Sequence, residues 1–134
     1  GTTSSIDYNV NELHSGWEYY FKVSAIINGK EVGMSDELHT VAACASPTGI
    51  SVKVVSNNEL SVTWDVGSAH GYYIEWSTDP TFAAKQSANL VGVNNTSKAI
   101  TVSGDASKYY VRVRLWRYWE DGYVYGNFSD AIKA

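Results

Sequence analysis

Hydrophobic and polar residues alternate with a period of two along most of this chain of 134 residues. The clearest run is YYVRVRLW, Tyr109–Trp116, in which Val111 and Val113 are separated by Arg112 and Arg114. Successive side chains of a β-strand point to opposite faces, so this period predicts strands that bury one face. Four further runs share the pattern: Tyr19–Ile26, Glu59–Val66, Tyr72–Trp76 and Ala99–Val102. We find no long run with the 3.6-residue period of a helix.

The residues between these runs are typical of tight turns. Ile27–Glu31 contains Asn28-Gly29, a strong hairpin signal because both residues tolerate positive φ. Glu120–Tyr123 offers Asp121-Gly122 at the tip of a second hairpin. Closely spaced strands joined by such turns predict an all-β fold, an antiparallel immunoglobulin-like β-sandwich.

One stretch of the chain occurs twice. Tyr19–Glu37 reads YYFKVSAIINGKEVGMSDE, and Tyr109–Ala131 reads YYVRVRLWRYWEDGYVYGNFSDA. Each copy predicts a strand, a turn and a return strand, and each return strand ends in Ser-Asp. We interpret each copy as the last hairpin of a sandwich domain.

These residues resemble the fibronectin type III family, in particular its bacterial extracellular or cell-surface type. The resemblance is carried by Trp64, by Tyr72, Ile74 and Trp76, by the apolar run from Tyr109, and by the closing Ser. It implies that Tyr109, and Tyr19 in the first copy, is a corner tyrosine whose hydroxyl bonds back to nearby backbone. The second copy has Ser103 where the family has Leu, with Val102 one position earlier, which suggests a loop displaced by one residue.

The resemblance implies one complete domain and part of another. Residues 48–134 would form the complete domain, residues 44–47 a short linker, and residues 1–43 the last three strands of a preceding domain. Those three strands are expected at Gly1–Val10, Tyr19–Ile27 and Val32–Val41. Three strands cannot hide an apolar face alone. We expect a fragment of a longer protein, with self-association through the incomplete unit as one alternative and packing on the complete domain as another.

Charge and cysteine content narrow the classes of function. The net charge is −4 and the pI about 5.2, which disfavours nucleic acid as a partner because phosphate binders need a basic stripe. No apolar run approaches the length of a membrane helix, so membrane insertion is not expected. Cys44 is the single cysteine, so the fold needs no internal disulfide.

Candidate chemistry is sparse. His14, His39 and His70 have no metal-ligand spacing, and no nucleophile elbow or phosphate-binding loop is present. The sequence therefore predicts no enzyme, no catalytic residue, no metal and no cofactor. On the outward face of the last sheet, Glu75 and Tyr73 should lie beside Arg112 and Arg114, either as a solvated ladder with Arg stems over aromatic rings or as a recognition surface.

An aromatic hairpin at residues 116–125 is the strongest candidate for a binding site. Its candidate ligand-binding or partner-binding residues are Trp116, Tyr118, Trp119, Tyr123 and Tyr125. Exposed aromatic rings suit sugars or protein partners, but rings paired across the hairpin would simply stabilise it. Trp119 and Tyr123 flank the turn and are expected to be the least buried.

The resulting functional hypothesis is a non-catalytic spacer and interaction module of a larger extracellular or cell-surface protein. Its partners would be neighbouring domains, with protein or polysaccharide as further ligands. The alternative is a carbohydrate-binding module that uses the aromatic hairpin. A flat, open platform of Trp119 and Tyr123 would favour that alternative.

Overall fold

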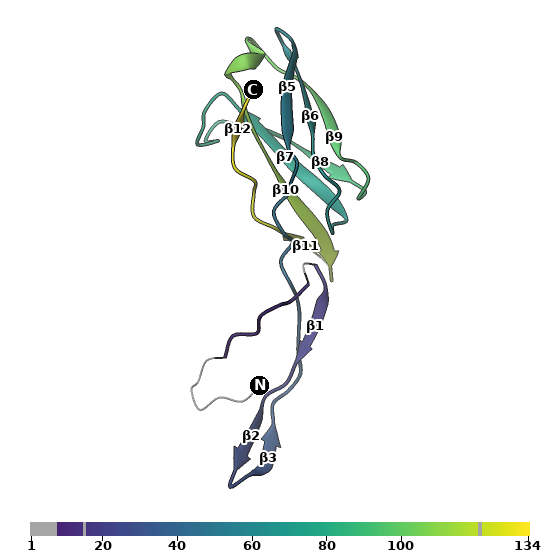
Figure 1. The fold of residues 1–134 in the computed structure, drawn as a ribbon, viewed down its shortest axis with the longest axis vertical. Coiled ribbons are helices and arrows are strands. Elements are labelled where there is room, and N and C mark those ends of the chain that lie inside the picture. The colour runs from purple at the N-terminus through teal and green to yellow at the C-terminus, as the bar shows by residue number, and fades with distance from the viewer. Residues whose placement is uncertain (1–7, 15, 121) are drawn as a thin grey trace. The chain divides into compact units, whose positions relative to one another are not determined.

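The computed structural model describes residues 8–14, 16–120 and 122–134 (Figure 1). The chain separates into two compact units, Gly1–Ala42 (unit 1) and Ala43–Ala134 (unit 2). The region predicted as a linker, residues 44–47, therefore lies within unit 2. Cys44 is buried in the core of that unit at 5% exposure, and its Sγ contacts the carbonyl oxygen of Val124 at 3.9 Å. Burial raises the pKa of this thiol, and the charge of Arg117 opposes the effect.

Unit 2 is a sandwich of two antiparallel sheets (Figure 1), and the predicted fold class is confirmed. The first sheet has the order β5-β6-β9, with strands β5 (Ser51–Ser56), β6 (Glu59–Thr63) and β9 (Ser97–Thr101). The second has the order β11-β10-β7-β8, with strands β7 (Gly71–Ser77), β8 (Gln86–Val91), β10 (Tyr110–Trp119) and β11 (Gly122–Tyr125). The short strand β12 (Ile132–Lys133) also pairs with β10, and a 3₁₀ turn, η1 (Ala106–Lys108), precedes β10.

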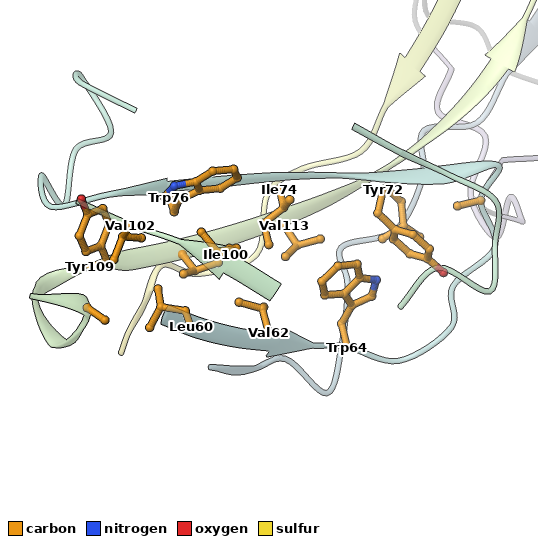
Figure 2. Close-up of a cluster of buried hydrophobic side chains, with 14 of the residues drawn as sticks. Leu60, Val62, Trp64, Tyr72, Ile74, Trp76, Ile100, Val102, Tyr109 and Val113 are labelled. Atoms are coloured by element: carbon orange, nitrogen blue, oxygen red, sulfur yellow. The ribbon is translucent and has the colours of Figure 1, made fainter. Parts of the chain in front are cut away.

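The core of unit 2 fills the space between these two sheets (Figure 2). Leu60 and Val62 of β6 face Ile74 of β7 and Val113 of β10, and each of the four is fully buried. Trp64 lies at the end of this row with its ring centroid 5.4 Å from that of Tyr72. The residues that alternate in the sequence are thus the ones that point inward, as period two predicts.

The corner tyrosine of unit 2 makes the expected bond. The hydroxyl of Tyr109 donates to the carbonyl oxygen of Ser103 at 3.0 Å. Val102 is buried, so the apolar position is filled one residue earlier and Ser103 supplies the acceptor. In unit 1 the direction of the hydrogen bond is reversed, because the Tyr19 hydroxyl accepts from the His14 amide at 2.7 Å.

The described residues of unit 1 form four short strands in two antiparallel pairs. They are β1 (Glu18–Phe21), β2 (Ser24–Ile27), β3 (Lys30–Met34) and β4 (Leu38–Val41), with β1 paired to β4 and β2 paired to β3. The strand predicted at Tyr19–Ile27 is thus interrupted between β1 and β2, and the strand predicted at Val32–Val41 is interrupted between β3 and β4. Of the strand predicted at Gly1–Val10, residues 1–7 lie outside the described residues, and Tyr8–Val10 form no strand.

The two predicted hairpin tips have different outcomes. Ile27 pairs with Lys30 across Asn28 and Gly29, whose φ values are 50° and 73°, so this turn is confirmed. In the other hairpin Trp119 pairs with Gly122, which places Gly122 in β11 and not at the tip. Glu120 lies in the turn, with φ at 54°, and Asp121 of the predicted tip lies outside the described residues. The register of the strands, which a short motif does not encode, decides the position of this turn.

The repeat seen in the sequence is also a repeat of hydrogen bonds. In unit 1 the Val23 amide donates to the Ser35 hydroxyl (2.9 Å) and the Ser35 amide to the Val23 carbonyl oxygen (2.7 Å). In unit 2 Val113 and Ser129 form the same pair of bonds, at 3.1 and 2.8 Å. In each copy the serine hydroxyl also donates to the carbonyl oxygen of the following aspartate. The serine of the closing Ser-Asp therefore ties the return segment to the first strand in both units.

The two copies differ sharply in burial. Val113 is 0% exposed, whereas its counterpart Val23 is 72% exposed. The strands of unit 1 leave further large apolar side chains more than half exposed: Tyr20, Ile26, Ile27, Val32, Met34 and Leu38. The position that is buried within unit 2, Val113, thus has an exposed counterpart in unit 1.

Candidate functional site

The candidate residues lie on the sheet β11-β10-β7-β8, on or near the face that points away from the core; we call this face the outer face. Strand β10 alternates, so Val111, Val113 and Leu115 are buried in the core while the residues between them point outward. Strand pairing then places side chains of β7 and β11 on the same face, because Arg112 lies opposite Glu75, and Tyr118 opposite Tyr123. The outer face carries Tyr73, Glu75, Arg112, Arg114, Trp116, Tyr118, Tyr123 and Tyr125.

Trp116 is completely buried on this face. Its indole ring lies against Gly71, the residue opposite it on β7. The rings of Tyr118 and Tyr123 cover it edge-on, each with its centroid 5.0 Å from that of Trp116. The prediction that Trp116 contacts a ligand needs correction, because the rings of Tyr118 and Tyr123 separate its ring from solvent. Trp116 packs beneath these two rings and supports them.

The tyrosines on this face form a row of contacting rings. The centroids of Tyr118 and Tyr123 are 4.7 Å apart and their hydroxyl oxygens 3.1 Å apart. Tyr125 stacks on Tyr123 at 5.8 Å. The bond from Tyr118 and partial burial raise the pKa of Tyr123, so the Tyr123 hydroxyl stays protonated at neutral pH. The predicted pairing of rings across the hairpin is present, yet Tyr118 and Tyr123 remain 50% and 45% exposed.

Trp119 lies on the opposite face of the hairpin from this row. It pairs with Gly122, one position beyond the Tyr118–Tyr123 pair, so its side chain points to the other side. Trp119 is also half-buried. Trp119 and Tyr123 therefore do not share one platform.

Two arginines continue the row of tyrosines along β10. The Arg112 guanidinium lies 4.2 Å from the ring centroid of Phe82 and 4.1 Å from that of Phe128. Its Nη2 is 2.6 Å from Glu75 Oε2, and Lys85 Nζ is 2.9 Å from the other carboxylate oxygen. The expected Glu75–Arg112 ladder with arginine over aromatic rings is present. Its carboxylate is not solvated, however, because the Glu75 side chain is only 2% exposed.

Arg114 is surrounded by aromatic rings and forms no ion pair with a carboxylate of the described residues. Its guanidinium carbon is 3.8 Å from the ring centroid of Tyr125, 4.6 Å from that of Phe128 and 4.9 Å from that of Tyr73. Its Nε is shielded from solvent and has no hydrogen-bond partner in the described part of the chain. Cation–π contact is thus its main stabilisation here.

Sequence reasoning missed Phe82 and Lys85 as parts of this face. Phe82 is 3% exposed and has a positive φ of 57°, which is uncommon for an aromatic residue. Asp79 holds the turn before it, accepting from the amide and hydroxyl of Thr81, and these bonds lower the pKa of Asp79. The sequence Asp79-Pro80-Thr81 was a turn signal that could have located this loop, but not its contact with Arg112.

His70 attaches the loop before β7 to the end of β10. Its Nδ1 accepts from the Tyr118 amide at 2.9 Å, and its own amide donates to the Trp116 carbonyl oxygen at 2.9 Å. Nδ1 can accept only while it carries no proton. Partial burial and, to a smaller extent, the charge of Arg117 lower the pKa of His70 below its ordinary 6.5.

Acidification should therefore weaken unit 2. Since the folded-state pKa of His70 lies below the unfolded one, the stability it contributes is complete above about pH 6.5 and is lost as the pH falls through the folded pKa. The loss should stay well below the ~1.4 kcal/mol of a full pKa unit, because the group is mostly solvated. Urea denaturation between pH 7.5 and 5 measures it. His70→Asn, whose amide oxygen can accept without titrating, should flatten the profile; an unchanged profile would contradict the role of His70. The carboxyls of Asp79 and Asp105 titrate below their ordinary 3.8, outside this window.

Gly71→Ala should destabilise unit 2 by about 1–3 kcal/mol, the usual cost of overpacking. A Cβ at Gly71 would collide with the Trp116 indole and with the Leu90 carbonyl oxygen. Denaturant unfolding followed by tryptophan fluorescence measures the change. Gly122→Ala is the matched control, because a Cβ there meets nothing within 4 Å and its effect should stay within about 0.5 kcal/mol. Equal effects at the two glycines would refute the proposed support of Trp116.

No group of three or more His, Cys, Asp or Glu side chains among the described residues could hold a metal ion. The same part of the chain has no helix able to span a membrane. What the outer face offers is a preorganised surface of rings and guanidinium groups.

Comparison with solved structures identifies the architecture as the fibronectin type III fold. The structure of the FN1–FN3 domains of chicken CNTN1 is similar to this chain with a TM-score of 0.55 and 27% identity, over 90% of this chain and 41% of that one. A segment of two fibronectin type III domains from chicken tenascin is similar with a TM-score of 0.57 and 15% identity, over 89% of this chain and 66% of that one. The chain thus spans less than half of the first structure and about two thirds of the second. No family model matches the sequence, and no curated protein matches it.

Proposed function

We propose that this chain is a non-catalytic spacer and interaction module of a larger multidomain protein, located outside the cell or at its surface. One observation carries the proposal: unit 1 repeats the serine-closed hairpin of unit 2, yet exposes Val23 where unit 2 buries Val113. A repeated hairpin with an open apolar face is what the end of a second domain of the same kind would present. The location rests on the resemblance to extracellular fibronectin type III domains.

The similarity to tandem domains supports this proposal. Both similar structures contain at least two fibronectin type III domains, and they match 90% and 89% of this chain. Those shares exceed the part of the chain that unit 2 provides, so the matched region extends into unit 1. A string of such units would hold neighbouring domains apart.

The proposal assigns residues 1–43 to the trailing part of a domain. Unit 2 shows what would complete it, because the sheet β5-β6-β9 covers the equivalents of the open face and β7 pairs with β10 beside them. Strands of that kind would bury Phe21 and Val23 as Val111 and Val113 are buried. At about 25 cal/mol per Å², covering several large apolar side chains would stabilise the unit by several kcal/mol.

Fusing a second copy of residues 43–108 directly in front of residue 19 tests this assignment, because Tyr19 then follows Lys108 as Tyr109 does in unit 2. The added segment contains β5 to β9 and η1, so a second complete domain should form. We expect the amides of residues 21–27 to gain protection from hydrogen exchange, with unit 2 unchanged. The same fusion with Val23→Asp should lose that protection. Unprotected amides in the first fusion would overturn the assignment of unit 1.

Carbohydrate binding by the aromatic hairpin is the second candidate, because Tyr118 and Tyr123 are about half exposed. Their rings are tilted by 37° to each other, which suits a flat sugar ring less well than parallel rings would. Titration of tryptophan fluorescence with soluble polysaccharides tests it, with Tyr123→Ala as the variant. We expect a flat response, and a saturable change lost in Tyr123→Ala would favour the sugar.

A further inference from the structure

We propose that the outer face of unit 2 binds an acidic, extended peptide segment of a partner protein. In this interaction a carboxylate of the peptide pairs with Arg114, and apolar side chains of the peptide rest on Tyr118, Tyr123 and Tyr125. The inference rests on the proposed function as an interaction module and names its surface and the chemistry of its partner.

Arg114 differs from its neighbour Arg112 in having no counterion. Arg112 is paired with Glu75 at 2.6 Å, whereas Arg114 contacts three aromatic rings and has no ion pair or hydrogen bond among the described residues. The rings of Tyr73, Tyr125 and Phe128 restrict the guanidinium, so little side-chain entropy remains to be lost on binding. A planar guanidinium matches a carboxylate through two parallel hydrogen bonds.

The charge around Arg114 favours an acidic partner. Lys85 and Arg112 share one carboxylate, that of Glu75. Arg114 lies two residues after Arg112 on the same face of β10, and Lys133 of β12 is opposite Tyr110 of β10. This region is positive although the net charge of the chain is −4. A local excess of one sign attracts ligands of the other and speeds their association.

The aromatic part of the face favours a peptide over a sugar. Tyr118, Tyr123 and Tyr125 are 50%, 45% and 38% exposed. The rings of Tyr118 and Tyr123 contact the buried Trp116, and Tyr125 stacks on Tyr123. The tilt between the Tyr118 and Tyr123 rings leaves an uneven surface that can accept side chains. An extended peptide directs alternate side chains to one side, so acidic and apolar positions can meet Arg114 and the tyrosines together.

Fluorescence polarisation with a labelled eight-residue peptide, (Glu-Ser-Leu-Ser)₂, tests this proposal on the full chain, because Glu and Leu two positions apart point to the same side of an extended peptide. We expect saturable binding, with amide shifts in NMR spectra confined to β7, β10 and β11. Arg114→Gln should weaken the affinity about tenfold or more, as loss of a charged hydrogen-bonding partner does. Arg114→Lys should also weaken it, since the ammonium group cannot bind bidentately. Lys53→Gln makes the same change in net charge on the exposed face of β5 and should have no effect.

Each other outcome has a definite meaning. An equal loss of affinity in Arg114→Gln and Lys53→Gln would overturn the proposal in favour of unspecific attraction. Equal binding of the same peptide with Lys in place of Glu would do so too. So would the absence of saturable binding, or binding of polygalacturonate alone. If Arg114→Gln unfolds, Tyr118→Ser takes its place, because Tyr118 is half exposed and its amide bond to His70 needs no side chain. The fusion experiment on unit 1 does not alter the outer face of unit 2. A negative result in the peptide-binding experiment therefore says nothing against the proposed function.

Discussion

Val113→Asp should abolish the folded state of unit 2, whereas Val23→Asp should leave the free energy of unfolding of that unit unchanged. The two valines hold the same position in the repeat, each joined to a closing serine by the same pair of hydrogen bonds. Val113 is 0% exposed and Val23 is 72% exposed. A buried, unpaired carboxylate costs several kcal/mol, and domains of this size are stable by only about 5–15 kcal/mol.

Circular dichroism and denaturant unfolding monitored by tryptophan fluorescence measure both variants. Val113→Asp should show no cooperative transition, and Val23→Asp should superimpose on the parent within about 0.5 kcal/mol. Val113→Ala, which should cost about 2 kcal/mol or more, keeps the comparison quantitative if the aspartate variant does not fold at all. A large loss of unit 2 stability in Val23→Asp would contradict the exposed position of this side chain.

The core of unit 2 was predictable because its strands bury one face only. In such strands period two separates inward from outward residues, so Leu60, Val62 and Trp64 were identified as one row, and they are buried together. The corner tyrosine was expected from the resemblance to the fibronectin type III family, and its hydroxyl bonds to backbone six residues away, at Ser103. Alternation and a short bond of this kind both involve residues that are close in sequence.

The outer face was less predictable because its burial depends on residues distant in sequence. Period two correctly placed Glu75 and Trp116 outward, and outward suggested contact with solvent. Glu75 is buried, however, beside Arg112, whose guanidinium lies over Phe82 from a loop that precedes β8. Trp116 is buried because Gly71 on the neighbouring strand leaves room for an indole. Such contacts are fixed by strand register and loop conformation, which alternation alone does not specify.

Glu75→Ala should lower the free energy of unfolding of unit 2 by about 2–3 kcal/mol. Removing one partner of a buried ion pair commonly costs about 3–5 kcal/mol, because the other charge stays buried without compensation. The lower figure applies here because the side chains of Arg112 and Lys85 are 26% and 42% exposed, so water can reach both. Glu59→Ala is the control, since this β6 carboxylate has no ion pair among the described residues, and its effect should stay within about 0.5 kcal/mol.

A double-mutant cycle separates the ion pair from the packing around it. Arg112 also contacts Phe82 and Phe128, so Arg112→Met keeps most of the apolar stem and removes the charge. In the background of Arg112→Met, Glu75→Ala should cost less than it costs in the parent, because only Lys85, whose side chain is 42% exposed, then loses its partner. Additive effects would mean that Glu75 and Arg112 do not depend on each other. Contacts with aromatic rings would then be the main stabilisation of both arginines on the outer face. Arg112 would resemble Arg114, which has only such contacts among the described residues.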